Sequence, residues 1–170
     1  RPDVEIGSNV WGGPTYAWSP DSRTIAVHYV DRRDMRKVPF PYYLGEETNA
    51  NNIRRGYPGD PNEYRTIGFF NVEDSDLKLL DLPNPTANRI VGFSWSPNGK
   101  LLLDQESDSA TDRWLHTVDP RDGGLKEIWH DHRETRIYTS IASAWHSDGE
   151  RVVFLSDLVD RYGLYLLTLG

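Results

Sequence analysis

Hydrophobic residues recur along this chain in short runs separated by turn residues, a pattern typical of β-strands. Apolar runs at 24–29, 100–103 and 151–155 each follow a segment rich in Ser, Pro, Asp, Asn or Gly, the residues that favour turns. No window of a dozen residues keeps the apolar spacing of a helix, because proline or glycine interrupts most candidates. The pattern therefore predicts an all-β protein.

One phrase occurs three times, each time just before one of these runs. It reads Tyr-Ala-Trp-Ser-Pro-Asp-Ser at 16–22, Phe-Ser-Trp-Ser-Pro-Asn-Gly at 93–99 and Ser-Ala-Trp-His-Ser-Asp-Gly at 143–149. A strand, a tight turn and a second strand form a hairpin, and the tryptophan supplies a large apolar surface for burial. Three copies indicate a repeated supersecondary unit.

The second copy is followed by two further predicted strands at 113–118 and 125–129, with a Pro- and Gly-containing turn between them. Four strands in about forty residues are typical of one blade of a β-propeller. We therefore predict about three four-stranded antiparallel blades in a single partial propeller domain over residues 1–170. The predicted blades are 14–81, with a long insertion at 32–63, then 89–130 and 138–170.

The first and third units differ from the second. In the first, the insertion delays the closing strands to 64–72 and 76–80, whereas the third shows strands only at 141–145, 151–156 and 163–169. Complete propellers have about four to eight blades. Three blades leave two open faces, so we expect the chain to be part of something longer and to form a homo-oligomer when alone.

The composition argues against several classes of function. Nineteen basic against twenty-six acidic residues give a net charge of −7, which argues against nucleic acid or an anionic membrane as a partner. The absence of cysteine excludes a disulfide framework, a thiol nucleophile and a cysteine zinc site. No apolar stretch approaches the roughly 18 to 20 residues of a membrane span.

The passage from the insertion into the following strand is more distinctive than the tryptophan hairpin, which also occurs in TolB-like propellers. It combines Val-Pro-Phe-Pro-Tyr-Tyr at 38–43, Arg-Gly-Tyr-Pro-Gly-Asp-Pro-Asn at 55–62 and Ile-Gly-Phe-Phe-Asn-Val at 67–72. Further on come Arg-Trp-Leu at 113–115 and Tyr-Gly-Leu-Tyr-Leu at 162–166. In order and spacing, these segments resemble the propeller of dipeptidyl-peptidase-IV-like serine peptidases of the prolyl oligopeptidase class.

This resemblance implies a non-catalytic propeller that gates and positions a peptide substrate. The nucleophilic serine, aspartate and histidine would lie in an α/β-hydrolase domain of the same parent chain. The resemblance favours a periplasmic or secreted parent. The parent would be a serine exopeptidase. No Gly-x-Ser-x-Gly elbow occurs here, so we assign no catalytic residue and expect no cofactor. The alternative is a TolB-like or WD-repeat-like propeller that serves as a protein-interaction module.

The resemblance also implies a pair of adjacent glutamates that holds the free amino terminus of the substrate. By position this pair would fall near Gly7 and Ser8, where only Glu5 is acidic. An oligopeptidase or acylaminoacyl type of activity in the parent therefore stays open beside a dipeptidyl activity.

Candidate contacts to substrate or partner lie in the insertion. A basic run begins with two arginines that could bind a carboxylate, and a proline-aromatic stretch at 39–43 could contact peptide or another subunit. The Glu-Glu pair of the chain follows this stretch. The candidates are Arg32, Arg33, Tyr42, Tyr43, Glu46 and Glu47.

Metal binding has two candidates, and we predict neither. His130 and His132 would share one face of a strand, but the sequence fixes no third ligand beside them. The acidic segment 104–112 lacks the glycine and the alternation of a calcium loop, which favours a solvated hairpin. His28 and His116 lie in predicted strands, where we expect hydrogen-bonded or surface histidines rather than bases.

Overall fold

A computed structural model describes residues 4–6, 15–44, 49–137, 142–158 and 161–170. Every regular element in these segments is a β-strand, and all strand pairs are antiparallel. The prediction of an all-β fold is confirmed. The described part of the chain holds no helix that could cross a membrane.

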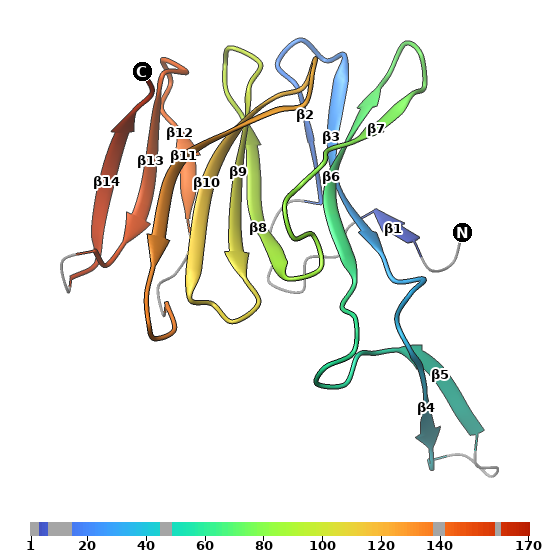
Figure 1. The fold of residues 1–170 in the computed structure, drawn as a ribbon. Helices are drawn as coiled ribbons and strands as arrows, with labels where there is room; N and C mark the ends of the chain where they lie inside the picture. The colour runs from blue at the N-terminus through green and yellow to red at the C-terminus, as the bar shows by residue number, and fades with distance from the viewer. Residues whose placement is uncertain (1–3, 7–14, 45–48, 138–141, 159–160) are drawn as a thin grey trace.

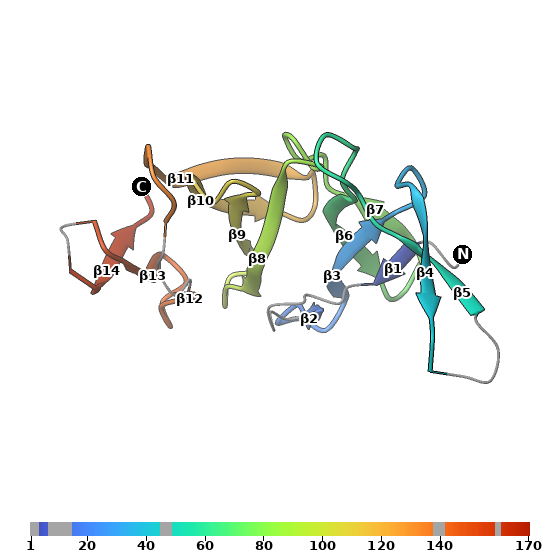
Figure 2. The same cartoon turned by 90° about the horizontal axis from the view of Figure 1, so that it is seen from below.

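Three sheets stand side by side in a row (Figures 1 and 2). The first sheet has the order β1-β3-β6-β7, with β2 also paired to β3, and the second has the order β11-β10-β9-β8. The third has the order β12-β13-β14. The first sheet consists of β1 (Val4–Ile6), β2 (Tyr16–Trp18), β3 (Thr24–Asp31), β6 (Tyr64–Asn71) and β7 (Leu77–Leu79). The second consists of β8 (Asn88–Trp95), β9 (Leu101–Ser107), β10 (Asp112–Asp119) and β11 (Gly124–His132), and the third of β12 (Ser143–Trp145), β13 (Arg151–Ser156) and β14 (Gly163–Thr168).

Much of the insertion forms a two-stranded hairpin that projects away from the row of sheets (Figure 1). We call this hairpin the arm; it consists of β4 (Lys37–Tyr42) and β5 (Asn49–Arg54). A backbone hydrogen bond from the Arg55 amide to the Arg36 carbonyl, 3.0 Å long, closes its base. The sequence pattern predicts only a detour here, so the arm is an element that the pattern did not reveal.

The three tryptophan phrases form the predicted hairpins, each around the same turn. The amides of Ser22, Gly99 and Gly149 each donate to the carbonyl three residues earlier, over 2.9, 3.1 and 3.0 Å. All three residues have a positive φ, of 59°, 80° and 71°. Glycine adopts this conformation without a steric cost, which explains its place in two of the three turns.

Two apolar cores hold the row together, one in each gap between neighbouring sheets. The core between the first and second sheets includes Phe69, Leu101 and Leu103, and the core between the second and third includes Leu102 and Phe154. Since neighbouring residues of a strand point to opposite faces, β9 contributes to both cores, and all seven of its residues are buried. The second sheet therefore supports both of its neighbours.

The same polar contact crosses both gaps. The indole Nε1 of Trp95 donates to the Ala17 carbonyl over 2.9 Å, and Nε1 of Trp145 donates to the Ser94 carbonyl over 3.1 Å. Ala17 directly precedes the tryptophan of the first phrase, and Ser94 that of the second. Each tryptophan thus bonds to the corresponding strand of the preceding sheet.

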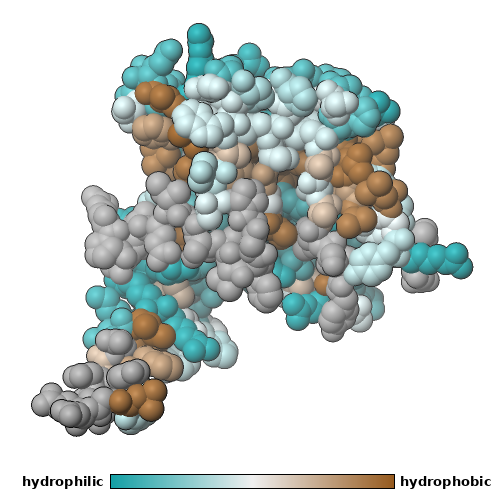
Figure 3. All heavy atoms as spheres, turned by 180° about the vertical axis from the view of Figure 1, so that it is seen from behind, coloured by the Kyte–Doolittle hydropathy of each residue, from teal (hydrophilic) through white to brown (hydrophobic). Residues whose placement is uncertain are grey.

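Hydrophobic side chains are also exposed at the two lateral ends of the row, as the brown atoms in Figure 3 show. Exposed leucines at these ends include Leu77 and Leu79 in the first sheet and Leu164 and Leu166 in the third. The exposed aromatic residues Tyr16 and Trp18 also belong to the first sheet. The outer faces of the terminal sheets are therefore apolar, and no other sheet of the described residues covers them.

Candidate functional site

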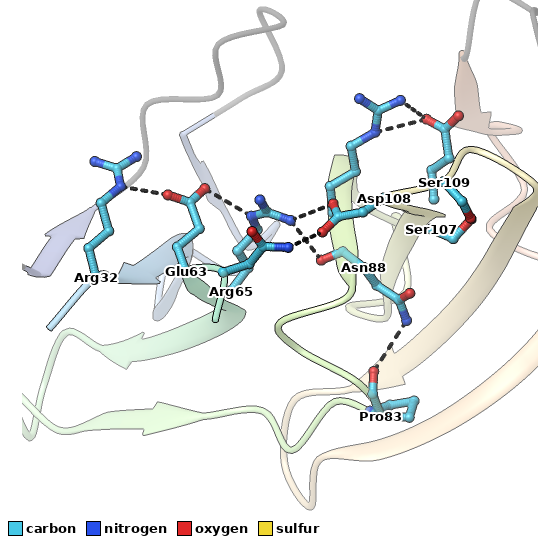
Figure 4. A network of polar contacts seen from close by, with 11 residues as sticks. Arg32, Glu63, Arg65, Pro83, Asn88, Ser107, Asp108 and Ser109 are labelled. Carbon is cyan, nitrogen blue, oxygen red and sulfur yellow. Dashed lines mark hydrogen bonds and ion pairs between the residues drawn. The ribbon is translucent and has the colours of Figure 1, made fainter. Parts of the chain in front are cut away.

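Charged and polar side chains gather at one end of the first two sheets, where β3 and β9 finish and β6, β8 and β10 begin (Figure 4). The sequence places polar residues here because each apolar strand stops at this level and a loop follows. The base of the arm joins the sheets at the same end. We call this set of residues the polar end.

Glu63 is the first centre of the polar end, where the insertion returns to the sheet. Its carboxylate accepts from Arg32 Nε over 2.5 Å and from Arg65 Nε over 2.9 Å. Burial raises the pKa of Glu63, but the hydrogen bonds from Arg65 and Arg32 outweigh it and hold that pKa below its ordinary value. The Glu63 carboxylate is therefore charged, and it joins Arg32, which follows β3, to Arg65 of β6.

Arg65 continues the contacts into the second sheet. Its Nη1 donates to Asp108 Oδ1 over 2.9 Å and to the Asn88 carbonyl over 3.2 Å (Figure 4). Asn62 Nδ2 also donates to Asp108, over 2.9 Å. The base of the insertion is thus joined to the loop between β9 and β10.

A second centre of the polar end is Asp112, at the start of β10. His130 Nε2 lies 3.0 Å and His132 Nδ1 lies 2.7 Å from Asp112 Oδ1, while the Thr111 hydroxyl donates to Oδ2 over 2.8 Å. Burial raises the pKa of Asp112, but the hydrogen bonds from His130, His132 and Thr111 bring it below its ordinary value. The His130 ring also stacks on Trp114, with ring centroids 5.1 Å apart.

The two histidines share one face of β11, as their spacing predicts. Asp112 lies beside them, yet no group of three or more His, Asp or Glu residues in the described segments is arranged to hold a metal ion. Their contacts join the end of β11 to the start of β10.

The acidic segment 104–112 is not one cluster, because each carboxylate has its own partner. Asp104 binds Arg113, Glu106 binds Arg89, Asp108 binds Arg65, and Asp112 contacts the two histidines. The expectation of a solvated hairpin is wrong for Asp104 and Glu106, whose side chains are almost fully buried. Asp104 and Glu106 lie on β9, Asp108 lies in the loop after it and Asp112 begins β10, so the four carboxylates meet different neighbours, which the sequence spacing alone does not show.

Charges in the basic run of the insertion are largely compensated. Arg33 forms an ion pair with Asp31, and the hydrogen bonds that Arg33 donates to the Asp31 carboxylate raise the pKa of Arg33. Arg36 Nη2 lies 3.0 Å from Asp60 Oδ1, and Arg36 Cζ lies 5.5 Å from the centre of the Tyr57 ring. Arg33 and Arg36 therefore stabilise the base of the arm through these contacts.

Among the candidate contact residues, the structure places the described ones at opposite ends of the arm. Arg32 and Arg33 lie at the base of the arm, whereas Tyr43 follows β4 at the opposite end and is 73% exposed. Tyr42 ends β4, and its side chain is not described. Glu46 and Glu47 lie outside the described residues.

The position that corresponds to the glutamate pair of the resembling family is only partly described. Gly7 and Ser8 lie outside the described residues. Glu5 lies in β1, where its backbone pairs with Val30 of β3. Sequence and structure thus leave the prediction about this pair untested.

Sequence reasoning missed the arginines that organise the site. Arg65 and Arg113 lie within apolar strands, and an isolated arginine in such a strand was the available signal. The expectation for His28 is also wrong, because His28 is buried and both of its ring nitrogens lack a hydrogen-bond partner among the described residues; His116 is buried as well, and its Nδ1 lacks such a partner. The roles of these arginines and histidines depend on the neighbouring sheet that covers them. A single sequence does not show which sheets become neighbours.

Comparison with known proteins identifies the family of this chain. The family model described as "Dipeptidyl peptidase IV (DPP IV) N-terminal region" matches residues 13–168. The venom dipeptidyl peptidase 4 of Apis mellifera is 26% identical over 172 residues, which cover 94% of this chain and 22% of that protein. The chain thus spans about a fifth of the length of this curated relative.

Two solved structures share the fold. Porphyromonas gingivalis dipeptidyl peptidase 4 superposes with a TM-score of 0.79 at 17% identity, over 96% of this chain and 24% of that chain. A Bacteroides ovatus protein described as a dipeptidyl aminopeptidase IV superposes with a TM-score of 0.76 at 18% identity, over 91% of this chain and 22% of that chain.

Proposed function

The chain belongs to the family of dipeptidyl peptidase IV N-terminal regions, and from this premise we propose that it is a non-catalytic part of a peptidase propeller. In this proposal the three sheets are consecutive blades that gate and position a peptide for a hydrolase domain elsewhere in the same parent chain. The observation that carries it is the family match over residues 13–168. The relatives named above are dipeptidyl peptidases, which does not favour an interaction propeller without a peptidase partner.

We place the contact to the peptide or the hydrolase domain at the polar end and the arm. A contact surface of this kind needs a rigid base and exposed aromatic groups. The ion pairs of Glu63, Arg65 and Asp108 supply the base, and Tyr43 supplies an exposed aromatic ring. Within this surface the proposed contacts are Arg32, Arg33, Tyr42, Tyr43, Glu46 and Glu47.

The test compares the 170-residue chain with a full-length parent protein on a chromogenic dipeptidyl anilide and on its N-acetylated counterpart. We expect no hydrolysis by the chain alone, because the described residues bring no serine or threonine hydroxyl into hydrogen-bonding contact with a histidine. We expect the parent to cleave the substrate with the free amino terminus. Preference for the acetylated substrate would instead support the acylaminoacyl alternative, and an inactive parent would contradict the proposal.

The gating role has its own test in the parent. Tyr43→Ser is expected to raise KM several-fold for a peptide of about ten residues and to leave hydrolysis of the small anilide unchanged. Tyr162→Ser, which changes an exposed tyrosine at the third sheet, is the matched control. Equal effects of the two substitutions on the long peptide would exclude the arm as a substrate contact.

A further inference from the structure

The turns of the three tryptophan phrases differ at one position, where the first and third carry aspartate and the second carries Asn98. Asp21 Oδ1 accepts from the Arg23 amide over 3.1 Å. Asp148 Oδ1 accepts in the same way from the Glu150 amide, over 2.9 Å. Each aspartate side chain is therefore held by the backbone of its own hairpin.

The second turn is one residue shorter than the other two, and its strands already pair at Ser96 and Lys100. The Lys100 amide donates to the Ser96 hydroxyl over 2.9 Å instead of to a side chain at the turn. Asn98 Nδ2 reaches the turn of the third sheet, where it donates to Glu150 Oε1 over 3.1 Å and to the Asp148 carbonyl over 3.4 Å. The contacts of Asn98 thus join two sheets.

The residue after Asn98 is Gly99, and no other asparagine of the sequence precedes a glycine. Because glycine has no Cβ, its backbone nitrogen can approach the preceding side chain without steric hindrance. Asn98 is exposed, and a Cβ placed on Gly99 would meet no atom within 4 Å. The turn therefore leaves open space around the two groups that can react with each other.

We propose that Asn98 is a site of spontaneous deamidation and that its conversion removes a contact between the second and third sheets. The Gly99 nitrogen forms a bond to Asn98 Cγ as the Cγ–Nδ2 bond breaks, and the Gly99 amide proton leaves with the Nδ2 group as ammonia. A water molecule then opens the cyclic succinimide. Opening at Cγ gives aspartate, whereas opening at the backbone carbonyl gives isoaspartate, in which the main chain runs through Cγ.

Both products carry a carboxylate in place of the side-chain amide. In the aspartate form, a negatively charged oxygen replaces the donor that now faces Glu150 Oε1 and the Asp148 carbonyl, and like charges at this distance repel each other. The isoaspartate form lengthens the main chain where the turns are already close, since a Cβ on Gly149 would lie 2.5 Å from Asn98 Nδ2. Deamidation is therefore expected to separate the two turns.

The first test keeps the folded 170-residue chain in a mildly alkaline buffer and follows its proteolytic peptides by mass spectrometry. We expect the Asn98 peptide to gain the mass difference between an amide and an acid before any other asparagine peptide changes, and to separate into aspartate and isoaspartate forms. Asn71, which precedes valine at the turn after β6, is the internal control. An Asn98 amide that persists in the folded chain while it is lost in urea would overturn the proposal.

Two variants test whether the turn controls the reaction. Asn98→Gln keeps the amide but needs a larger ring for the same attack, so we expect no mass change at this position. Glu150→Ala removes an acceptor that holds Asn98 Nδ2, and we expect the conversion of Asn98 to become several-fold faster. An unchanged rate in Glu150→Ala would contradict the link between the contact and the reactive site.

The consequence for the fold is tested with Asn98→Asp, which reproduces the aspartate product. We expect this variant to have a lower urea midpoint than the wild type. Glu150→Gln in the same chain is expected to restore much of the loss, because a glutamine can donate to the new carboxylate. Glu150→Gln alone completes the double-mutant cycle. Shifts that simply add would refute repulsion between the two turns.

Discussion

Arg113 shows most clearly how single residues stabilise this fold. Its guanidinium donates to both oxygens of Asp104, over 3.0 and 2.8 Å, and both side chains are almost fully buried. Arg113 Nη1 also donates to the Leu155 carbonyl over 2.7 Å, and the Ser143 hydroxyl donates to Asp104 over 2.7 Å. One buried ion pair on the second sheet thus binds two strands of the third.

Asp104→Asn is expected to destabilise the chain by about 3 to 5 kcal/mol, because it leaves the Arg113 charge buried without a counter-charge. The free energy of unfolding in urea measures this loss. Asp119→Asn is the matched control, since Asp119 pairs with the exposed Arg121, and it is expected to leave the urea midpoint nearly unchanged. Equal shifts of the two midpoints would mean that burial does not determine the strength of the Asp104 pair.

His28 makes stability depend on pH. Burial lowers its pKa from the ordinary value of 6.5, and the nearby Arg65 and Arg32 lower it further, while Glu63 acts in the opposite direction. The unfolded chain therefore binds a proton at a higher pH than the folded chain does. The stability contributed by neutral His28 is present above about pH 6.5 and is lost as the pH falls below it.

His28→Leu is expected to reduce the dependence of the unfolding free energy on pH between pH 6.5 and 5.5. The largest possible reduction is about 1.4 kcal/mol per pH unit, the value for one proton. His116, whose pKa burial also lowers, keeps part of the dependence in this variant. Urea unfolding at several pH values measures the slope. An unchanged slope in His28→Leu would refute the role of His28.

The arm is the element that the main fold needs least. Phe40, Tyr43 and Leu44 are exposed, and the arm pairs only with itself along its strands. The ion pairs that fix its base belong to Arg32, Glu63 and Arg65, which lie outside the hairpin. The row of sheets should therefore fold without the arm.

Replacing residues 37–54 with a short Gly-Asn-Gly turn is expected to leave the urea midpoint and the far-ultraviolet spectrum of the sheets nearly unchanged. The short turn can connect Arg36 to Arg55, which already pair through their backbones. Replacing the turn at 119–124 within the second sheet is the contrasting variant, and it should lower the midpoint. A large loss of stability on removal of the arm would show that it supports the sheets.

Elements differ in how well the sequence predicts them. The hairpins around the tryptophan phrases were predictable because turn residues and alternating apolar residues agree there. The strands of the arm were not, since β4 contains Pro39 and Pro41 and half of β5 is asparagine, all residues that strands disfavour. Contacts between sheets, such as those of Arg65 and His28, depend on which faces meet, and strand patterns carry no such information.

At the scale of the whole molecule, the two cores make the three sheets depend on one another. β9 supplies Leu101 and Leu103 to one core and Leu102 to the other. Loss of the second sheet would expose the inner faces of both neighbours. The row should therefore unfold as one cooperative unit.

Leu103→Ala is expected to cost about 2 to 5 kcal/mol, as for other buried leucines, and to lower the stability of all three sheets together. Tryptophan fluorescence and far-ultraviolet circular dichroism should show a single coincident transition at a fixed protein concentration. Leu79→Ala, at an exposed position of β7, should have a much smaller effect. Two separate transitions would show that the sheets unfold independently.

The indole contacts between sheets bear on how such a chain could have grown during evolution. Each sheet unit carries a donor for the sheet before it and an acceptor for the sheet after it, as Trp95 and the Ser94 carbonyl show within the second unit. A gene segment that encodes one unit therefore copies both halves of the contact when it is duplicated. The new unit would fit between its neighbours at once, and later substitutions could give it a separate role without disturbing that fit.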